Sequence, residues 1–199
     1  MNKKPNLYII AGANGAGKTT TSFSVFPEIL KCKEYINADS IATAISPFNP
    51  ESVSINAGKI MINRIDKLIQ QKENFAFETT LSSKSILRII EKAKTSGYKI
   101  DILFFYLNSY QIAIQRVKER VKQGGHNIPR EVIMRRYRRG IINLINTYKN
   151  ICDYCMIANN SGTNPKIIAE IKNNSQQIIS IHSEADWHKI NIYAKNKKQ

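Results

Sequence analysis

The sequence Gly12-Ala13-Asn14-Gly15-Ala16-Gly17-Lys18-Thr19 matches the phosphate-binding pattern G-x-x-x-x-G-K-[ST]. Glycines allow successive backbone N–H groups to turn inward around phosphate oxygens, and a helix that follows such a loop favours negative charge at its N-terminus. An apolar run at residues 6–11 precedes the loop, and a helical segment follows it until Pro27 ends the helix. This context predicts a nucleoside triphosphate site that extends through Thr20. We expect Lys18 to reach the β- and γ-phosphates and the Thr19 hydroxyl to bind Mg²⁺.

Outside the loop, short apolar runs alternate with helical segments. The runs lie at residues 34–37, 75–77, 99–107 and 154–158. Alternation of this kind predicts an α/β protein with the P-loop kinase fold, in which a parallel sheet of about five strands carries helices on both faces. Residues 165–199 read differently, as a small β-hairpin followed by a terminal helix. We therefore expect a kinase domain at residues 1–164 and an extension at 165–199 that packs on the same domain.

The charge of the chain is unusual for its length. Its 199 residues include 30 Lys and Arg against 15 Asp and Glu, which gives a net charge of +15. Such an excess points to an anionic partner, namely nucleic acid, an anionic membrane or a phosphorylated small molecule. No apolar run approaches the 18 or so residues that span a bilayer, so we expect a cytoplasmic protein with no membrane partner.

The three cysteines do not form a disulfide framework or a four-cysteine zinc site, because Cys32 stands alone beside one C-x-x-C pair, Cys152 and Cys155. A redox pair is one interpretation of this spacing. The other is two small side chains at the start of a strand.

Two acidic residues follow predicted strands, where ligands bind in open parallel sheets. Asp39 is placed to take a proton from a substrate hydroxyl during phosphoryl transfer, although Asp39 or Ser40 could equally cap a short helix. Glu78 ends an apolar strand as the acid of a Walker B element does, which suits Mg²⁺ binding, and Thr79 and Thr80 could hydrogen-bond a polar substrate. The competing interpretation is a surface glutamate followed by threonines that end the strand.

Residues 116–140 carry nine Lys or Arg and two Glu, a net charge of +7. Two basic helices flank the segment Gly124–Pro129, which is the layout of a kinase lid that closes over phosphate. The candidate lid residues are Arg116, Arg120, His126, Arg135 and Arg136. We expect two or three of the cations to contact phosphate, the others to be solvated, and His126 to be a hydrogen-bonding loop residue.

Six segments together resemble the zeta-toxin-like family of P-loop kinases, in particular its compact bacterial branch of predicted UDP-N-acetylglucosamine kinases. They are residues 12–20, Asn37-Ala38-Asp39, residues 75–81 (F-A-F-E-T-T-L), residues 116–121, residues 124–129 (G-G-H-N-I-P) and Arg135-Arg136-Tyr137. The resemblance runs from about residue 5 to 162. One departure is Asn159, which stands where the branch usually has Asp, and the insertions that hold uridine in other toxins are not identifiable.

The resemblance implies phosphorylation of the 3′-hydroxyl of the amino sugar of UDP-N-acetylglucosamine by ATP or GTP with Mg²⁺. It implies that Asp39 is the catalytic base, that Glu78 and Thr80 lie on the substrate side, and that Arg120 and Arg136 are the lid arginines. It also implies a toxin that an antitoxin protein holds inactive. Two alternatives remain from the residues alone, a kinase of another acceptor such as a nucleoside or a nucleic-acid end, and a nucleotide-dependent switch with slow hydrolysis.

Overall fold

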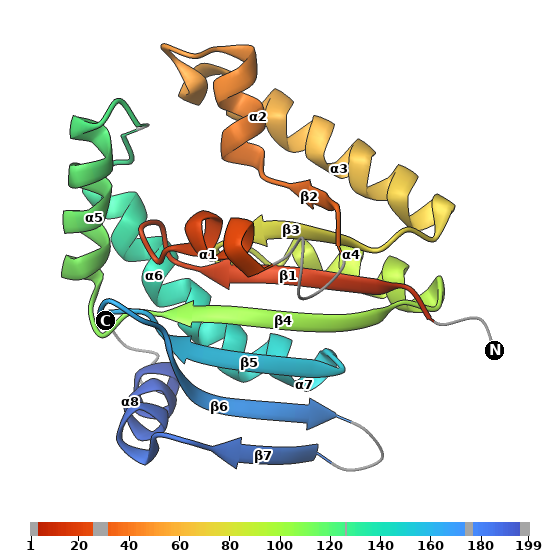
Figure 1. Cartoon of the computed structure of the whole chain (residues 1–199), viewed down its shortest axis with the longest axis vertical. Coiled ribbons are helices and arrows are strands. Elements are labelled where there is room, and N and C mark those ends of the chain that lie inside the picture. The colour runs from red at the N-terminus through yellow and green to blue at the C-terminus, as the bar shows by residue number, and fades with distance from the viewer. Residues whose placement is uncertain (1–3, 26–31, 126, 174–176, 196–199) are drawn as a thin grey trace.

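A computed structural model describes residues 4–25, 32–125, 127–173 and 177–195 of the chain (Figure 1). The predicted helix end at Pro27 and the candidate lid residue His126 fall outside the described residues.

One seven-stranded sheet forms the centre of the protein, with the strand order β2-β3-β1-β4-β5-β6-β7. Its strands are β1 (Asn6–Gly12), β2 (Glu34–Ile36), β3 (Phe75–Thr79), β4 (Lys99–Tyr106), β5 (Tyr154–Asn159), β6 (Lys166–Asn173) and β7 (Gln177–Ile181). The first five pair in parallel, and β6 and β7 continue the sheet antiparallel from β5. The parallel sheet is confirmed, but the expected number of about five strands is too low. The C-terminal hairpin joins the same sheet because β6 covers the edge that β5 would otherwise expose.

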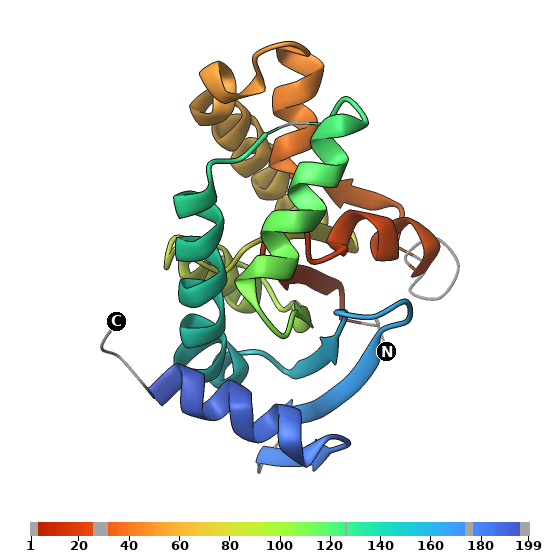
Figure 2. The ribbon, with the colours of Figure 1, turned by 90° about the vertical axis from the view of Figure 1, so that its left-hand side faces the viewer.

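The helices are α1 (Lys18–Val25), α2 (Ala38–Ile45), α3 (Ser54–Gln71), α4 (Ile86–Thr95), α5 (Tyr110–Lys122), α6 (Arg130–Asn143), α7 (Lys149–Ile151) and α8 (Glu184–Lys195), with a 3₁₀ turn η1 (Pro50–Val53) and a π turn η2 (Leu144–Tyr148). Figures 1 and 2 place α1 on one face of the sheet and α4 and α6 on the other. Helix α5 stands beyond the carboxyl ends of the parallel strands (Figure 2). Helices on both faces are therefore confirmed. No helix in the described ranges is both long enough and apolar enough to cross a bilayer.

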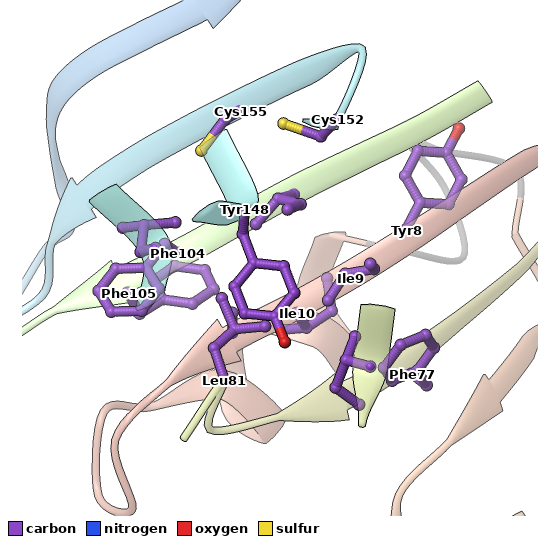
Figure 3. Packing of buried hydrophobic residues seen from close by; sticks show 14 of the residues in the cluster. Tyr8, Ile9, Ile10, Phe77, Leu81, Phe104, Phe105, Tyr148, Cys152 and Cys155 are labelled. Carbon is purple, nitrogen blue, oxygen red and sulfur yellow. The ribbon is translucent and has the colours of Figure 1, made fainter. Parts of the chain in front are cut away.

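The core explains why β1 reads as a continuous apolar run. Leu7, Ile9 and Ile10 have no exposed surface, because helices cover both faces of this central strand. Figure 3 shows Tyr148 of η2 reaching the sheet beside Leu81 and Ile10. The Tyr148 hydroxyl donates to the Ser83 carbonyl oxygen at 2.8 Å, which satisfies its one polar group inside the core.

The C-x-x-C pair lies in this core (Figure 3). Cys152 and Cys155 are both fully buried at the start of β5. Their mutual hydrogen bond and burial raise the pKa of the Cys155 thiol well above its ordinary value. Redox chemistry requires a thiolate that is accessible, so the structure favours the interpretation of the pair as packing residues.

We expect residues 165–195 to be essential for stability rather than a removable appendage. A chain that ends at residue 164 loses the buried side chains of Ile168, Ile171 and Ile190 and exposes the edge of β5. The predicted cost is at least about 5 kcal/mol of the free energy of unfolding. Thermal unfolding of this chain, compared with a control that ends at Lys195, measures the effect. Equal melting temperatures would contradict the expectation.

Candidate active site at the carboxyl ends of the strands

The glycine-rich loop connects β1 to α1 at the carboxyl edge of the sheet. Gly12, Gly15 and Gly17 adopt positive φ angles of 145°, 76° and 82°, which residues other than glycine rarely adopt. The Ala16 N–H donates to the Ala13 carbonyl oxygen at 3.1 Å, so the loop closes tightly before the helix begins. The loop and helix start therefore have the form that the G-x-x-x-x-G-K-T pattern predicts for phosphate binding.

Lys18 places a buried ammonium group inside this loop. Its Nζ donates to the Ala13 carbonyl oxygen at 3.0 Å, and only 8% of the residue is exposed. Burial lowers the pKa of Lys18 from its ordinary value, since the charged form loses water. Four charged residues act on the same ammonium. The carboxylates of Glu78 and Asp39 raise its pKa, and the guanidinium groups of Arg120 and Arg136 lower it. Four candidate site residues from four different segments therefore act on the pKa of Lys18.

Arg116 and Asn160 connect the phosphate loop to the segment that follows β5. The Arg116 guanidinium donates to the carbonyl oxygens of Asn160 and Ser161 at 2.8 and 3.1 Å, with longer contacts to those of Gly15 and Gly162 at 3.5 and 3.4 Å. The Asn160 side-chain amide donates to the Ala16 carbonyl oxygen at 2.7 Å. Arg116, a candidate lid residue, is thus committed to backbone carbonyls. Its role in this geometry is to tie the phosphate loop to the segment after β5.

Asp39 lies in the first turn of α2, but it does not cap the helix. The cap is Asn37, whose Oδ1 accepts hydrogen bonds from the backbone N–H groups of Asp39 and Ser40 at 2.8 and 3.2 Å. The interpretation of Asp39 or Ser40 as the cap is therefore wrong, because the residue before the helix already provides the acceptor. Asp39 is exposed, and its carboxylate raises the pKa of the same ammonium as that of Glu78 does.

Glu78 is held at the end of β3 by a neighbouring strand. The Tyr35 hydroxyl, from β2, donates to Glu78 Oε1. Burial and this hydrogen bond raise the pKa of Tyr35, so the hydroxyl keeps its proton and remains a donor. A half-buried carboxylate with a fixed tyrosine partner differs from the surface glutamate of the competing interpretation. Tyr35 is not among the site residues predicted from the sequence. Only the pairing of its strand with β3 indicates that it lies near Glu78.

Arg136 is a second lid candidate, after Arg116, that contacts the phosphate loop. Its Nη1 donates to Asn14 Oδ1 at 3.2 Å. Arg120 contributes to the charge around Lys18 from the last turn of α5, whereas Arg135, next to Arg136 on α6, is exposed. The role of Arg136 as the lid arginine of α6 stays a prediction.

The segment Thr79–Ser83, which we call the acceptor loop, is fixed by α6 and η2. Leu81 is fully buried with a left-handed φ of 52°, and its N–H donates to Thr79 Oγ1 at 3.1 Å. The Asn143 side chain donates to the Leu81 carbonyl oxygen at 2.7 Å, and the hydroxyls of Thr80 and Ser82 share a hydrogen bond of 2.8 Å. These contacts stabilise a backbone conformation that leucine rarely adopts, at the point where the predicted substrate threonines lie.

Asn159, which stands where the compact branch usually has Asp, makes several hydrogen bonds at the end of β5. The Asn159 amide donates at 2.9 Å to Asp186 of α8 and to Asn108. Its Oδ1 accepts from the N–H and hydroxyl of Ser161 at 3.0 and 2.6 Å. Asparagine at this position can donate to Asp186, whereas a second carboxylate would repel it. The terminal helix therefore supplies a carboxylate beside the end of β5.

Magnesium binding would rest on few protein groups. No cluster of three His, Cys, Asp or Glu suited to a metal occurs within residues 4–25, 32–125, 127–173 and 177–195. The Thr19 hydroxyl and the Glu78 carboxylate suit Mg²⁺, which usually takes one or two protein oxygens together with substrate phosphates. The residues present therefore fit a nucleotide-bound Mg²⁺ rather than a site built from protein ligands alone.

A family model and a sequence relative match this chain. The Zeta toxin family model matches residues 1–169. An uncharacterized protein of Haemophilus influenzae (strain ATCC 51907 / DSM 11121 / KW20 / Rd) is 35% identical over 126 residues, which cover 63% of this chain and 88% of that protein.

Two solved structures share the fold. The AvrRxo1-ORF1:AvrRxo1-ORF2 complex with ATP matches with a TM-score of 0.77 and 15% identity, over 95% of this chain. This chain spans 64% of the length of that one. The PezAT chromosomal toxin–antitoxin system of Streptococcus pneumoniae matches with a TM-score of 0.64 and 15% identity, over 98% of this chain and 86% of that one. At these identities the structures establish the fold alone.

The packing of α6 on the acceptor loop gives a prediction for Gly140. A Cβ at this position would lie 2.5 Å from the Thr80 carbonyl oxygen, so Gly140→Ala must displace either the helix or the loop. We expect a loss of about 1–3 kcal/mol in the free energy of unfolding, measured by urea denaturation. Gly58→Ala is the matched control, since its Cβ meets no atom within 4 Å; it should gain up to about 1 kcal/mol from helix propensity. Two gains of similar size would contradict the close approach.

The contacts of Arg116 and the exposure of Arg135 predict different effects of their removal. Arg116→Ala leaves the carbonyl oxygens that it serves without their charged donor, and we expect a loss of about 2 kcal/mol in the free energy of unfolding. Arg135→Ala removes an exposed side chain and should change it by less than about 0.5 kcal/mol. If Arg116→Ala unfolds with the wild-type midpoint, the supporting role of Arg116 fails.

Proposed function

The chain belongs to the zeta toxin family, and on that premise we propose that this P-loop phosphotransferase transfers the γ-phosphoryl group of ATP or GTP to a hydroxyl of a nucleotide sugar. The acceptor that we favour is UDP-N-acetylglucosamine, phosphorylated on the 3′-hydroxyl of its amino sugar. The observation that carries the proposal is the phosphate loop closed around the buried Lys18 ammonium, on whose pKa Glu78, Asp39, Arg120 and Arg136 all act.

Each of these residues has a chemical part to play in the proposed reaction. Lys18 and the backbone N–H groups of the loop bind the phosphates of the donor, and residues 12–20 form its site. Asp39 accepts the proton of the attacking hydroxyl, for which an exposed carboxylate beside Lys18 is suited. Arg120 and Arg136 stabilise the charge that spreads over the transferred phosphoryl oxygens.

Magnesium, when bound, neutralises charge on the donor phosphates. Thr19 and Glu78 are the residues that would hold it. Thr79 and Thr80 lie directly after Glu78 in the acceptor loop, where their hydroxyls are held by Leu81 and Ser82. We assign these threonines to binding of the polar acceptor.

The family membership also supports a toxin role with an antitoxin protein as partner. The PezAT match is described as a toxin–antitoxin system, and we extend that description to this chain as part of the proposal. Production of the chain in a bacterial host without a partner should then arrest growth or cause lysis, and Asp39→Asn should abolish the effect.

Direct assay of the reaction tests the proposal. Wild-type protein with Mg²⁺, ATP and UDP-N-acetylglucosamine should give a phosphorylated sugar nucleotide, detected by mass spectrometry. Asp39→Asn should lower its rate by about 10²–10⁴-fold, because the variant lacks the base, while ATP binding measured by calorimetry is kept. Ser40→Ala, beside it on α2, is the control that should retain activity.

Two results would redirect this assignment. If wild-type protein consumes ATP only with a nucleoside or an oligonucleotide end, its acceptor is a different one. Because the net charge is +15, the experiment should also measure how oligonucleotide binding depends on salt concentration. Wild-type activity in Asp39→Asn would remove Asp39 as the base.

A further inference from the structure

A pocket of about 410 Å³ lies at the C-terminal end of α6, between the π turn η2, the turn before α4 and the end of α8. Its polar lining comes from Lys84, Asn143, Asn146, Thr147 and Lys195. Figure 2 shows α8 lying across the lower end of α6. None of the residues that act on the pKa of the phosphate-loop lysine lines this pocket, so it is separate from the phosphate site.

Two lysines from distant parts of the chain line the pocket. Lys84 lies just before α4, and Lys195 is the last residue of α8. Among the described residues, no Asp or Glu lines the pocket and neither lysine forms an ion pair. By contrast, Lys92 and Lys99 are each paired with an aspartate, at 2.7 and 3.0 Å. Two positive charges that no acid offsets attract an anion to this pocket.

The π turn adds neutral hydrogen-bond donors to the lining. Asn143, Asn146 and Thr147 are three or four residues apart, so their side chains leave the same side of the helix. Amide and hydroxyl groups of this kind donate to anionic oxygens. The Asn146 amide also donates to the Ala194 carbonyl oxygen at 3.4 Å, which places the end of α8 beside the turn. Such π turns are frequent at functional sites.

The pocket shares a wall with the acceptor loop. Asn143, which lines the pocket, donates to the Leu81 carbonyl oxygen at 2.7 Å. Lys84 follows the loop directly, and the preceding carbonyl oxygen, that of Ser83, accepts from the Tyr148 hydroxyl at 2.8 Å. These contacts hold Leu81 at its left-handed φ of 52°. A ligand that binds Lys84 and Asn143 therefore acts on the backbone that supports Leu81.

Volume and charge together select the class of ligand. Small-molecule sites in proteins measure about 300–1,000 Å³, and this pocket lies within that range. Two lysines match a dianion, and a phosphate monoester carries a charge of about −1.5 to −2 near neutral pH with three acceptor oxygens. A nucleic-acid backbone carries a single charge on each phosphate and tracks an extended basic surface rather than a pocket of this size.

We infer that this pocket binds a phosphorylated small molecule, with Lys84 and Lys195 as its cations and Asn143 and Asn146 as donors to its phosphate oxygens, and that a bound ligand acts on the acceptor loop. The pocket is a second phosphate site, seven residues of α6 or about 10 Å beyond Arg136. It requires neither a nucleotide-sugar acceptor nor a particular donor, so it stands or falls separately from the proposed function.

Titration with inorganic phosphate, followed in amide NMR spectra of isotope-labelled full-length protein, tests the pocket. Mg²⁺ and a non-hydrolysable ATP analogue are added first, so that the phosphate loop is occupied. Inorganic phosphate should then shift the side-chain amide signals of Asn143 and Asn146 and reach saturation. Acetate at equal ionic strength should bind at least about tenfold more weakly, because it carries one charge. Shifts that do not saturate, or equal affinity for acetate, would overturn the inference.

Substitution of each lysine identifies the cations. Lys84→Gln and Lys195→Gln should each raise the Kd for phosphate by about tenfold, because each removes one charged donor. Lys189→Gln is the matched control, since it removes the same charge from an exposed position of α8 outside the pocket, and it should keep the wild-type Kd. Equal weakening in all three variants would mean that phosphate responds only to the net charge of the surface, and would overturn the site.

The same spectra test the link to the acceptor loop. Phosphate should shift the backbone amide signals of Thr80 and Leu81 with the Kd measured at Asn146, and in Lys84→Gln these signals should follow the raised Kd. Loop signals that stay unchanged while Asn146 titrates would overturn the link.

A single-stranded oligonucleotide separates a small ligand from a polymer. It should leave the Asn143 and Asn146 signals unchanged, whereas displacement of phosphate by the oligonucleotide would assign this face to nucleic acid and overturn the small-molecule site. None of these measurements uses phosphoryl transfer, so they decide the pocket whether or not the proposed function holds.

Discussion

The site depends on a single buried ammonium group, that of Lys18. Burial disfavours the charged form of this group, whereas the Ala13 carbonyl oxygen and the carboxylates of Glu78 and Asp39 favour it. These carboxylates come from β3 and from the first turn of α2, so the position of both segments is linked to the same charge. Because Arg120 and Arg136 oppose that charge, the site holds two acids and three cations in near balance. An additional anionic group, such as a phosphate, is what this arrangement favours electrostatically.

Helix α6 joins the parts of the site that must act together. Arg136 contacts the phosphate loop from one turn of the helix, Gly140 lies against Thr80 one turn later, and Asn143 holds the Leu81 carbonyl oxygen where the π turn begins. A π turn changes the direction in which side chains leave a helix, and such turns are frequent at functional sites. Here it brings Tyr148 under the acceptor loop (Figure 3). The phosphate loop and the segment Thr79–Ser83 therefore share α6 as a common support.

Much of this arrangement follows from the sequence, for identifiable reasons. The phosphate loop could be predicted because its glycines and its Lys-Thr pair are required at fixed spacing, and the strands because each is a short apolar run. The hairpin was predicted, but its place in the sheet was not, because pairing of β6 with β5 is a long-range contact that local pattern does not encode. The supports were missed for a similar reason. Arg116 was predicted to be another lid cation, and Tyr35 and Asn143 carry no motif, because the partners of all three lie on other segments. Asn37 was noted only as part of the segment Asn37-Ala38-Asp39, and its role as the cap of α2 was not predicted.

The contact between Asn159 and Asp186 links the end of β5, and through Asn160 the phosphate loop, to a helix close to the end of the chain. Synthesis proceeds from the N-terminus, so a ribosome-bound chain contains the complete G-x-x-x-x-G-K-T loop long before α8 emerges. During that interval β5 lacks β6 along its edge, and Asn159 lacks its carboxylate partner. The end of β5, which supports the phosphate loop through Asn160, therefore gains its full set of contacts only once β6 and α8 have been synthesised and have folded against it.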